Sequence, residues 1–286
     1  MITVIIPTYN RREVLKDVLP SYLRQKYVER IILVDDGSTD DTKGMIKTLA
    51  EKEDRINYIC LLKRKGAPAA KNAAINYLTS NYVLIGEDDV ELDDSYAENL
   101  LKCLNEKKVS GVAGRIIYIG EKEKKLDALE RVDKLGGNII DAKNITSDFQ
   151  LKRDKPIQVP FFHAVALFRS SVFNKYRYDE NYIKNSYREE TDFALQLSKN
   201  GHKLFFCPSA VCYHLPRKKV SFGGQREMNR LFYEIFTVIN NARFLRKHYN
   251  YLRKELDINH TRFVQNLIFG TNRIKKQVGY LIKLIR

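Results

Sequence analysis

The sequence predicts an α/β fold in which helices flank a mostly parallel sheet. Three observations support this fold class. The strands expected in the first hundred residues are short, they are apolar throughout, and a helical segment separates each strand from the next. Strands buried on both faces are typical of parallel sheets, whose neighbouring strands need a crossover helix between them. With 286 residues, the chain is long enough for one large domain or two modest ones.

The first hundred residues alternate strictly between strand and helix patterns. Strands are expected at four apolar runs, residues 2–7, 30–34, 56–61 and 82–86. Helices are expected between these runs, at residues 12–25, 42–52 and 69–79. In the first of these helices, Val14, Leu15 and Val18 fall on one side, which is the spacing of an amphipathic helix.

The middle of the chain is less regular. Residues 121–134 are highly charged and fit either a helix or a mobile loop. Residues 136–155 mix Gly, Asn, Asp and Lys, which is typical of a flexible segment over a cleft. Regular structure is expected again in three places, an apolar stretch at 161–168, a helix at 192–199 and a strand at 203–211 that is broken at Pro208.

After Pro216 the composition changes. Two stretches, residues 226–248 and 264–286, place apolar residues at helical spacing among many Lys and Arg side chains. We therefore expect residues 217–286 to form a basic amphipathic helical extension. Such helices could cover the preceding domain, form an oligomer interface or lie peripherally on a membrane surface.

The charge and cysteine content restrict the class of protein. Lys and Arg total 50 against 35 Asp and Glu, so the net charge is +15 and an anionic partner is expected. Nucleic acid is not the expected partner, since no helix-turn-helix, zinc or RNP-like signature occurs. The four cysteines form no CxxC pair, which argues against zinc and for a reducing cytoplasm. The absence of a signal-peptide pattern or an apolar spanning run favours a cytoplasmic location, at most at the inner face of a membrane.

Polar side chains gather where the four predicted strands end. They form four ordered clusters: Pro7-Thr8-Tyr9-Asn10, Asp35-Asp36-Gly37-Ser38-Thr39-Asp40, the segment 65–72, and Glu87-Asp88-Asp89. Consecutive carboxylates at the end of a buried strand repel one another, and a cation or cation-carrying ligand relieves the repulsion. Ligands of open parallel sheets bind at this edge. The clusters suit a nucleotide that carries a diphosphate, although each of them also fits an ordinary solvated turn.

This ordered series resembles the family 2 glycosyltransferases with the GT-A (Rossmann-like) fold. Members of that family have the same first two motifs, a Gly-rich segment that ends in Arg-Asn, a strand that ends in Asp-x-Asp, and a Glu-Asp pair at a later helix. The last motif matches residues 188–193 here. The resemblance covers residues 1–216 and implies a catalytic domain there. Its nucleotide-binding half would be about residues 1–115 and its acceptor-side half about residues 116–216.

The resemblance implies donor binding by Pro7, Thr8, Tyr9, Asp35, Gly66, Lys71, Glu87 and Asp88. Asp35 would accept a hydrogen bond from the nucleobase. Lys71 stands where the family usually has Arg, and it would face the base or the phosphates as a point charge. Glu87 replaces the first Asp of the Asp-x-Asp motif. Asp89 would hold Mg²⁺ or Mn²⁺, with His214 as a further ligand.

The implied reaction is transfer of a sugar from a UDP-, GDP- or dTDP-linked donor to the hydroxyl of a saccharide or lipid-linked acceptor, in cell envelope polysaccharide or glycolipid biosynthesis. An alcohol is a poor nucleophile, so a base is needed, and Glu190 aligns with the catalytic Asp of the family. Glu189 is the alternative if the register differs by one. Direct displacement by the activated hydroxyl would invert the anomeric centre. An inactive nucleotide-sugar-binding relative and a basic nucleic-acid-binding protein remain as alternatives. His163 is expected to be a packed histidine.

Overall fold

The computed structural model describes residues 1–162, 165–220 and 222–285, so His163 lies outside the described residues. A nine-stranded sheet forms the centre, in the order β3-β2-β1-β4-β10-β6-β11-β5, with β9 beside β11. The parallel N-terminal part consists of β1 (Ile2–Thr8), β2 (Val28–Asp35), β3 (Ile56–Cys60) and β4 (Tyr82–Ile85). The fold class predicted from the sequence is confirmed.

The second part of the sheet is mixed. Strand β10 (Ala166–Arg169) runs antiparallel to both β4 and β6 (Gly111–Tyr118), and β11 (Leu204–His214) runs parallel to β6. The short strands β5 (Val90–Leu92) and β9 (Ile157–Gln158) run antiparallel to β11. The carboxyl ends of β1, β2, β4, β6 and β11 therefore all point to one edge of the sheet. This topology brings the later strand ends, Tyr118 and His214, to the same edge as the early motifs.

Helices cover the sheet. They are α1 (Arg12–Leu23), α2 (Thr42–Ala50), α3 (Ala67–Ile75), α4 (Tyr96–Glu106), α5 (Lys125–Asp133) and α6 (Glu189–Lys199). The sequence predicts α1, α2, α3 and α6 but not α4. Short 3₁₀ turns lie at Ser170–Asn174 and Gly224–Glu227. Helix α3 packs on β1 and β2, and α4 packs on β6 and β11. The charged residues 121–134, which fit either helix or loop, contain the helix α5.

Two expectations for the middle of the chain are wrong. Residues 136–155 do not form a flexible segment over a cleft. They contain a small ribbon of β7 (Ile140–Asp141) and β8 (Thr146–Ser147), and Ile145, Phe149 and Leu151 are buried in the core. Strand β11 does not end at Pro208 but continues to His214, although its pairing with β6 shifts register between Cys207 and Val211. The shift leaves the proline, which has no N–H to donate, out of the ladder.

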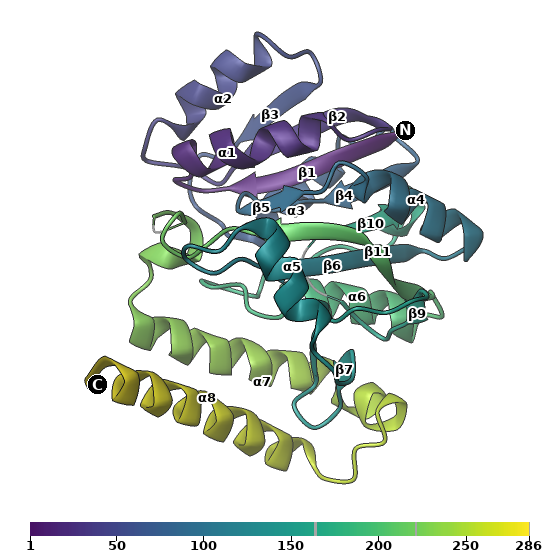
Figure 1. Cartoon of the computed structure of the whole chain (residues 1–286), viewed down its shortest axis with the longest axis vertical. Coiled ribbons are helices and arrows are strands. Elements are labelled where there is room, and N and C mark those ends of the chain that lie inside the picture. The colour runs from purple at the N-terminus through teal and green to yellow at the C-terminus, as the bar shows by residue number, and fades with distance from the viewer. Residues whose placement is uncertain (163–164, 221, 286) are drawn as a thin grey trace.

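The last seventy residues end in a helical hairpin of α7 (Arg230–Glu255) and α8 (Arg262–Ile285). Figure 1 shows the two helices side by side and antiparallel at the foot of the molecule, with α7 between α8 and the sheet. Phe244, Leu245 and Leu252 of α7 belong to the same buried cluster as the strands. The division into a catalytic domain at 1–216 and an extension at 217–286 stays a prediction. Among the described residues, no helix combines the length and apolar character that crossing a bilayer requires.

Candidate active site

A cavity of about 360 Å³ opens at the carboxyl edge of the sheet. It is lined by eleven of the twelve site residues expected from the sequence: Pro7, Thr8, Tyr9, Gly66, Lys71, Glu87, Asp88, Asp89, Glu189, Glu190 and His214. Residues separated by more than two hundred positions, such as Pro7 and His214, thus share one cleft. Asp35 is the exception. It is buried, and its carboxylate accepts from the Ser38 amide at 2.8 Å, while its neighbour Asp36 lines the cleft.

Tyr22 of α1 holds the backbone just after β4 through two hydrogen bonds. The Tyr22 hydroxyl donates to the Glu87 carbonyl at 3.0 Å and accepts from the Glu87 amide at 3.1 Å. Gly86 makes room for the ring, since a Cβ there would lie 2.8 Å from Tyr22 Cε1. The aromatic ring of a buried helix residue therefore fixes the backbone at the start of the acid triplet.

Glu87, Asp89 and His214 present three ligand atoms that all lie within 4.8 Å of one another. His214 Nδ1 lies 3.0 Å from the Leu215 carbonyl, which can only accept, so Nδ1 carries the proton. Nε2 lies 3.6 Å from Asp89 Oδ1, so a neutral ring would present its lone pair to that side. Two carboxylates and an imidazole lone pair facing one another suit Mg²⁺ or Mn²⁺. The donor set therefore fits a divalent cation.

The acid triplet is partly compensated by Arg11, which the sequence analysis did not single out. Its guanidinium is buried and lies 3.9 Å from Asp88 and 4.0 Å from Asp89. Thr8 Oγ1 also donates to Asp88 at 2.8 Å. Burial nevertheless raises the pKa of Glu87 well above its ordinary value, with Asp89 and Glu190 adding to the effect. The triplet holds more negative charge than the described residues around it neutralise.

A second charged cluster joins α3 to the start of α6. Lys71 is buried, and its Nζ contacts Glu189 and lies 3.1 Å from Glu190 Oε1. Glu189 has 1% of its side chain exposed and Glu190 has 25%. Burial raises the pKa of Glu189 well above its ordinary value. Burial would also raise the pKa of Glu190, but the charge of Lys71 and the hydrogen bonds with Glu189 and Lys71 together lower it. Glu190 is thus the ionised, cleft-facing member of the pair.

The backbone just before α6 is strained. Lys184, Ser186 and Arg188 have φ values of 63°, 49° and 76°, a region that non-glycine residues rarely adopt. Lys184 and Ser186 line the cleft. The C-terminal helices hold this segment, since Asn185 Nδ2 donates to Thr237 Oγ1 at 2.7 Å and the Arg188 guanidinium lies 4.7 Å from the centre of the Phe244 ring. The helix α7 therefore helps to fix the backbone that carries Glu189 and Glu190.

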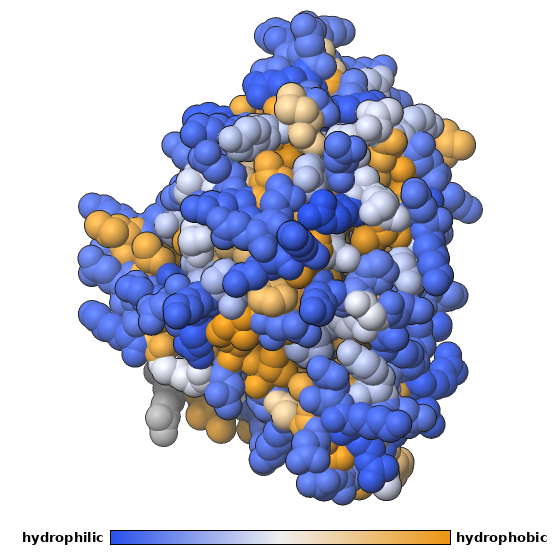
Figure 2. Space-filling model, turned by 90° about the vertical axis from the view of Figure 1, so that its right-hand side faces the viewer, coloured by the Kyte–Doolittle hydropathy of each residue, from blue (hydrophilic) through white to orange (hydrophobic). Residues whose placement is uncertain are grey.

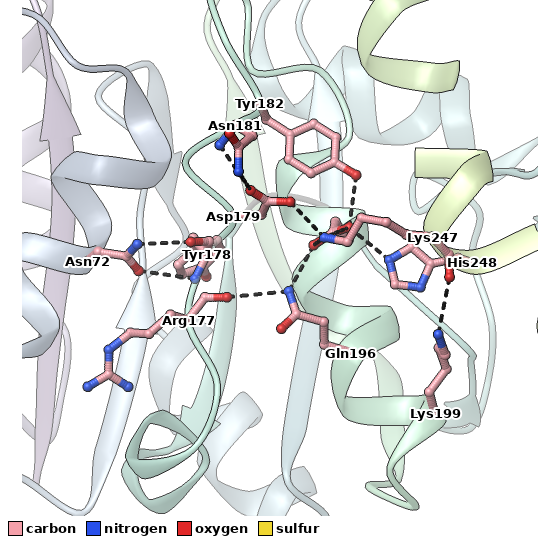
Figure 3. Close-up of polar contacts among 11 residues, drawn as sticks. Asn72, Arg177, Tyr178, Asp179, Asn181, Tyr182, Gln196, Lys199, Lys247 and His248 are labelled. Carbon is pink, nitrogen blue, oxygen red and sulfur yellow. Dashed lines mark hydrogen bonds and ion pairs between the residues drawn. The ribbon is translucent and has the colours of Figure 1, made fainter. Parts of the chain in front are cut away.

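Helix α6 is also tied to α7 by a buried polar network around Asp192. Figure 3 shows Lys247 and His248 reaching from α7 to the same point as Tyr182 and Gln196. Each of these four side chains bonds the Asp192 carboxylate, Tyr182, His248 and Gln196 at 2.8 Å and Lys247 at 2.6 Å. Asp192 is completely buried, so these bonds replace the water that its charge has lost.

The segment between β11 and α7 closes one end of the cleft. Gly224 N donates to the Tyr9 carbonyl at 2.9 Å, and Arg64 donates to the Gly224 carbonyl at 2.7 Å. Gly223 has φ of 75°, and a Cβ there would lie 2.1 Å from the Asn10 carbonyl oxygen, so only glycine fits. The Arg64 guanidinium also stacks 4.0 Å from the centre of the Tyr9 ring. The first motif is therefore enclosed by a loop from the far end of the chain.

Further cleft residues were not found by sequence reasoning: Arg11, Asp36, Arg64, Tyr118, Lys184, Ser186, Gln225 and Tyr233. Arg11 and Asp36 carried a signal, since the first directly follows one strand-end motif and the second lies inside another. Tyr118 carried none, because only the pairing of β6 with β11 places it beside His214, where the two rings stack with centroids 5.0 Å apart.

The curated relatives that the chain resembles include glycosyltransferases. A glycosyltransferase, GlyA, of Streptococcus pneumoniae is 34% identical over 123 residues, which are 43% of this chain and 18% of that protein. A GalNAc(5)-diNAcBac-PP-undecaprenol β-1,3-glucosyltransferase of Campylobacter jejuni is 26% identical over 190 residues, which are 64% of this chain and 56% of that protein. The chain thus matches no more than about half the length of either relative.

Solved structures agree in fold. A mannosyltransferase of Pyrobaculum calidifontis, solved with GDP-Man and Mn²⁺, aligns with 94% of this chain and 73% of its own, with a TM-score of 0.63 and 17% identity. That likeness confirms the GT-A fold. The family described as Glycosyl transferase family 2 matches residues 3–177, more than half of the chain. The chain therefore belongs to glycosyl transferase family 2.

Proposed function

We propose that this chain transfers a sugar from a nucleoside diphosphate donor to an acceptor hydroxyl with inversion at the anomeric carbon, using a divalent metal and a carboxylate base. The observation that carries the proposal is the convergence, in one cleft, of the Glu87, Asp89 and His214 cluster with the Lys71, Glu189 and Glu190 cluster. The first suits a metal on a diphosphate, and the second offers an ionised carboxylate for proton abstraction.

The two clusters would have different roles in the reaction. Glu190 faces the cleft and would take the proton of the acceptor hydroxyl, while the buried Glu189 and Lys71 hold it in place. Lys71 pairs with these two carboxylates in the structure, so its contact with the nucleobase or the phosphates stays a prediction. The contact of Asp35 with the nucleobase also stays a prediction. Glu87, Asp89 and His214 would hold Mg²⁺ or Mn²⁺, which when bound neutralises charge on the leaving diphosphate.

The relatives indicate the chemical classes of the donor and the acceptor, but not the particular sugar or nucleotide. The Pyrobaculum structure contains GDP-Man and Mn²⁺, and the name of the Campylobacter relative places its acceptor on an undecaprenyl diphosphate. We propose a nucleotide-sugar donor and a saccharide or lipid-linked acceptor, and a role in cell envelope glycan synthesis. A location in the cytoplasm or at the inner face of the membrane remains part of this proposal.

A thermal-shift panel of UDP, GDP and dTDP, each with and without Mn²⁺, tests the binding half of the proposal. A ligand at a hundred times its dissociation constant should stabilise the chain by about 2.7 kcal/mol. We expect one diphosphate to stand out only when Mn²⁺ is present, and Asp89→Ala to abolish its effect. Equal shifts without metal would contradict the proposal.

Product analysis tests the reaction half. The anomeric configuration of the transferred sugar, measured by NMR, should be opposite to that of the donor. A retained configuration would contradict direct displacement. Binding without any turnover on saccharide and lipid-linked acceptors would instead favour the inactive nucleotide-sugar-binding alternative.

A further inference from the structure

A second cavity, of about 550 Å³, lies where the two hairpin helices meet the loop that leads into them. Residues that follow β11, the first turns of α7 and the second half of α8 line it. Four of the described lining side chains are cationic and one is acidic, namely Arg217, Arg230, Arg273 and Lys276 against Glu234. We call this cavity the basic groove.

The charge of Glu234 is already used inside the basic groove. Its carboxylate accepts from Arg273 Nε at 2.7 Å and from Arg273 Nη2 at 2.6 Å, and Gln277 also donates to it. A bidentate pair of this kind neutralises one arginine. Among the residues that the structure describes, no acid pairs with Arg217 or Lys276. These two cations are therefore left for an anion from outside the chain.

The fold itself directs both cations to the groove. Lys276 follows the buried Phe269 by seven residues and the buried Gln265 by eleven, which are about two and three turns of a helix. Lys276 therefore lies on the inward side of α8. Arg217 follows His214 by three residues, so the strand that brings His214 to the metal-ligand cluster also leads a cation into the groove.

Charge alone would not distinguish this place from the rest of the surface. The chain has 50 Lys and Arg residues, and hydrophilic residues cover most of the face shown in Figure 2, with hydrophobic residues in smaller patches. The basic groove differs because it is concave and because it adjoins the catalytic cleft. Gln225 and Tyr233 line both cavities. A group bound in the groove would therefore lie beside whatever occupies the cleft.

The shared wall lies next to the segment that carries the proposed base. The Tyr233 carbonyl accepts from Asn185 Nδ2 at 2.9 Å, and Asn185 stands just before α6, which begins with Glu189 and Glu190. The three residues proposed to hold the metal line the cleft but not the groove. An anion in the groove would thus belong to the molecule that approaches Glu190, which is the acceptor, and not to the leaving diphosphate.

We propose that the basic groove binds a phosphate or diphosphate group of the acceptor. Guanidinium and ammonium groups bind phosphate oxygens through charge-assisted hydrogen bonds. A phosphate ester carries about two negative charges at neutral pH, which matches the two cations left without an acid, whereas a carboxylate carries a single charge. Binding of the group does not depend on the transfer reaction. Its role in selecting the acceptor rests on the proposed function.

A ³¹P NMR titration of the full chain with inorganic pyrophosphate tests the binding. EDTA is present, so no metal can hold the probe at the acid triplet. We expect saturable binding, and the double variant Arg217→Gln, Lys276→Gln should weaken it about tenfold, since two charge-assisted contacts are lost.

The matched control is Arg246→Gln, Lys275→Gln. It removes one Arg and one Lys from exposed positions on α7 and α8 that do not line the groove, and it should bind pyrophosphate like the unaltered chain. All four positions are exposed, so thermal melting should not change. An equal loss in both double variants, or no loss in either, would overturn the proposal. So would the absence of binding, or tighter binding of glucuronate, which offers a carboxylate instead.

A second titration distinguishes a soluble source of the phosphate from a lipid. Farnesyl diphosphate carries the same diphosphate on an apolar chain. Equal affinity for it and for pyrophosphate would support a groove that recognises the phosphate alone, as on a soluble sugar phosphate. Binding that is at least about tenfold tighter and is lost in Arg217→Gln, Lys276→Gln would support a lipid-linked phosphate. Tighter binding that this variant leaves intact would contradict the proposal.

Turnover links the groove to the reaction. For a phosphate-bearing acceptor, Arg217→Gln, Lys276→Gln should raise the KM about tenfold, whereas the KM of the donor should stay the same. Donor binding with Mn²⁺ is measured in parallel. Loss of donor binding with intact pyrophosphate binding would count against the proposed function alone, and the opposite result would count against the groove alone.

Discussion

The acid triplet after β4 and the buried Asp192 of α6 hold negative charge in opposite ways. Asp192 is completely buried and bonds four side chains, two of them, Lys247 and His248, from another helix. Glu87 and Asp89 are partly exposed and face each other, His214 and the distant guanidinium of Arg11. A carboxylate that the protein satisfies itself is structural, whereas one left short of positive charge is prepared for a ligand.

The pKa values of Asp192 and Glu87 differ in the same way as their surroundings. Burial would raise the pKa of Asp192, but the hydrogen bond from His248 and the charge of Lys247 hold it below its ordinary value. Burial raises the pKa of Glu87, and the neighbouring carboxylates raise it further. The comparison can be broken by variants that act on one cluster and leave the other intact.

The largest effect is expected from Glu190→Gln. The amide cannot accept the proton of the acceptor hydroxyl, so kcat should fall about 10³-fold. Donor affinity, measured by nucleotide-dependent thermal shift, should stay nearly unchanged. Glu189→Gln is the matched variant. If it and not Glu190→Gln removes turnover while preserving donor binding, the base is Glu189.

The second largest effect is expected from Asp89→Asn. Its kcat/KM should fall about 10²-fold because the metal is held less well. Its stability should equal or exceed that of the unaltered chain, since one of three crowded acids loses its charge. Urea unfolding and turnover in increasing Mn²⁺ measure both quantities. A marked loss of stability would mean that Asp89 is structural, and the distinction between the two clusters would fail.

Asp192→Asn should show the reverse pattern. The variant removes the buried charge that four side chains bond and leaves Lys247 with Asp179 alone, so the free energy of unfolding should drop by about 3 kcal/mol. Turnover per folded molecule should fall less than for Asp89→Asn, because Asp192 does not line the cleft. Urea denaturation supplies the first number and activity corrected for the folded fraction the second. Unchanged stability would show that the network contributes little.

The smallest effect concerns pH. Burial lowers the pKa of His248, and its Nδ1 is buried without a partner, so the ring is neutral in the fold. A folded pKa below the unfolded value of about 6.5 means that stability is present above that pH and is lost as the pH falls. Asp192, also lowered, adds a further loss below about pH 4. His248→Gln keeps a donor to Asp192 and should flatten the unfolding free energy between about pH 7 and pH 5. An identical slope in both chains would contradict this assignment.

The strand-end motifs could be placed from the sequence because parallel strands share one carboxyl edge. Pro7, Asp36 and Glu87 each follow a short apolar run, and the chain direction alone puts them together. Tyr118 and Lys184 could not be placed in this way. The position of Tyr118 depends on the pairing of β6 with β11, which sets it beside His214, and that of Lys184 on a strained backbone held by α7.

The sequence by itself determined the alternation of apolar strands and helices, the polar clusters at the strand ends and the family to which they point. These are local properties, set by hydrophobic period and by motif order. Only the tertiary structure decided which carboxylates are satisfied and which are left open, and that α7 holds the segment before Glu189. Both depend on side chains from distant elements, and the free energy of a buried charge is set by whichever partners the fold brings to it.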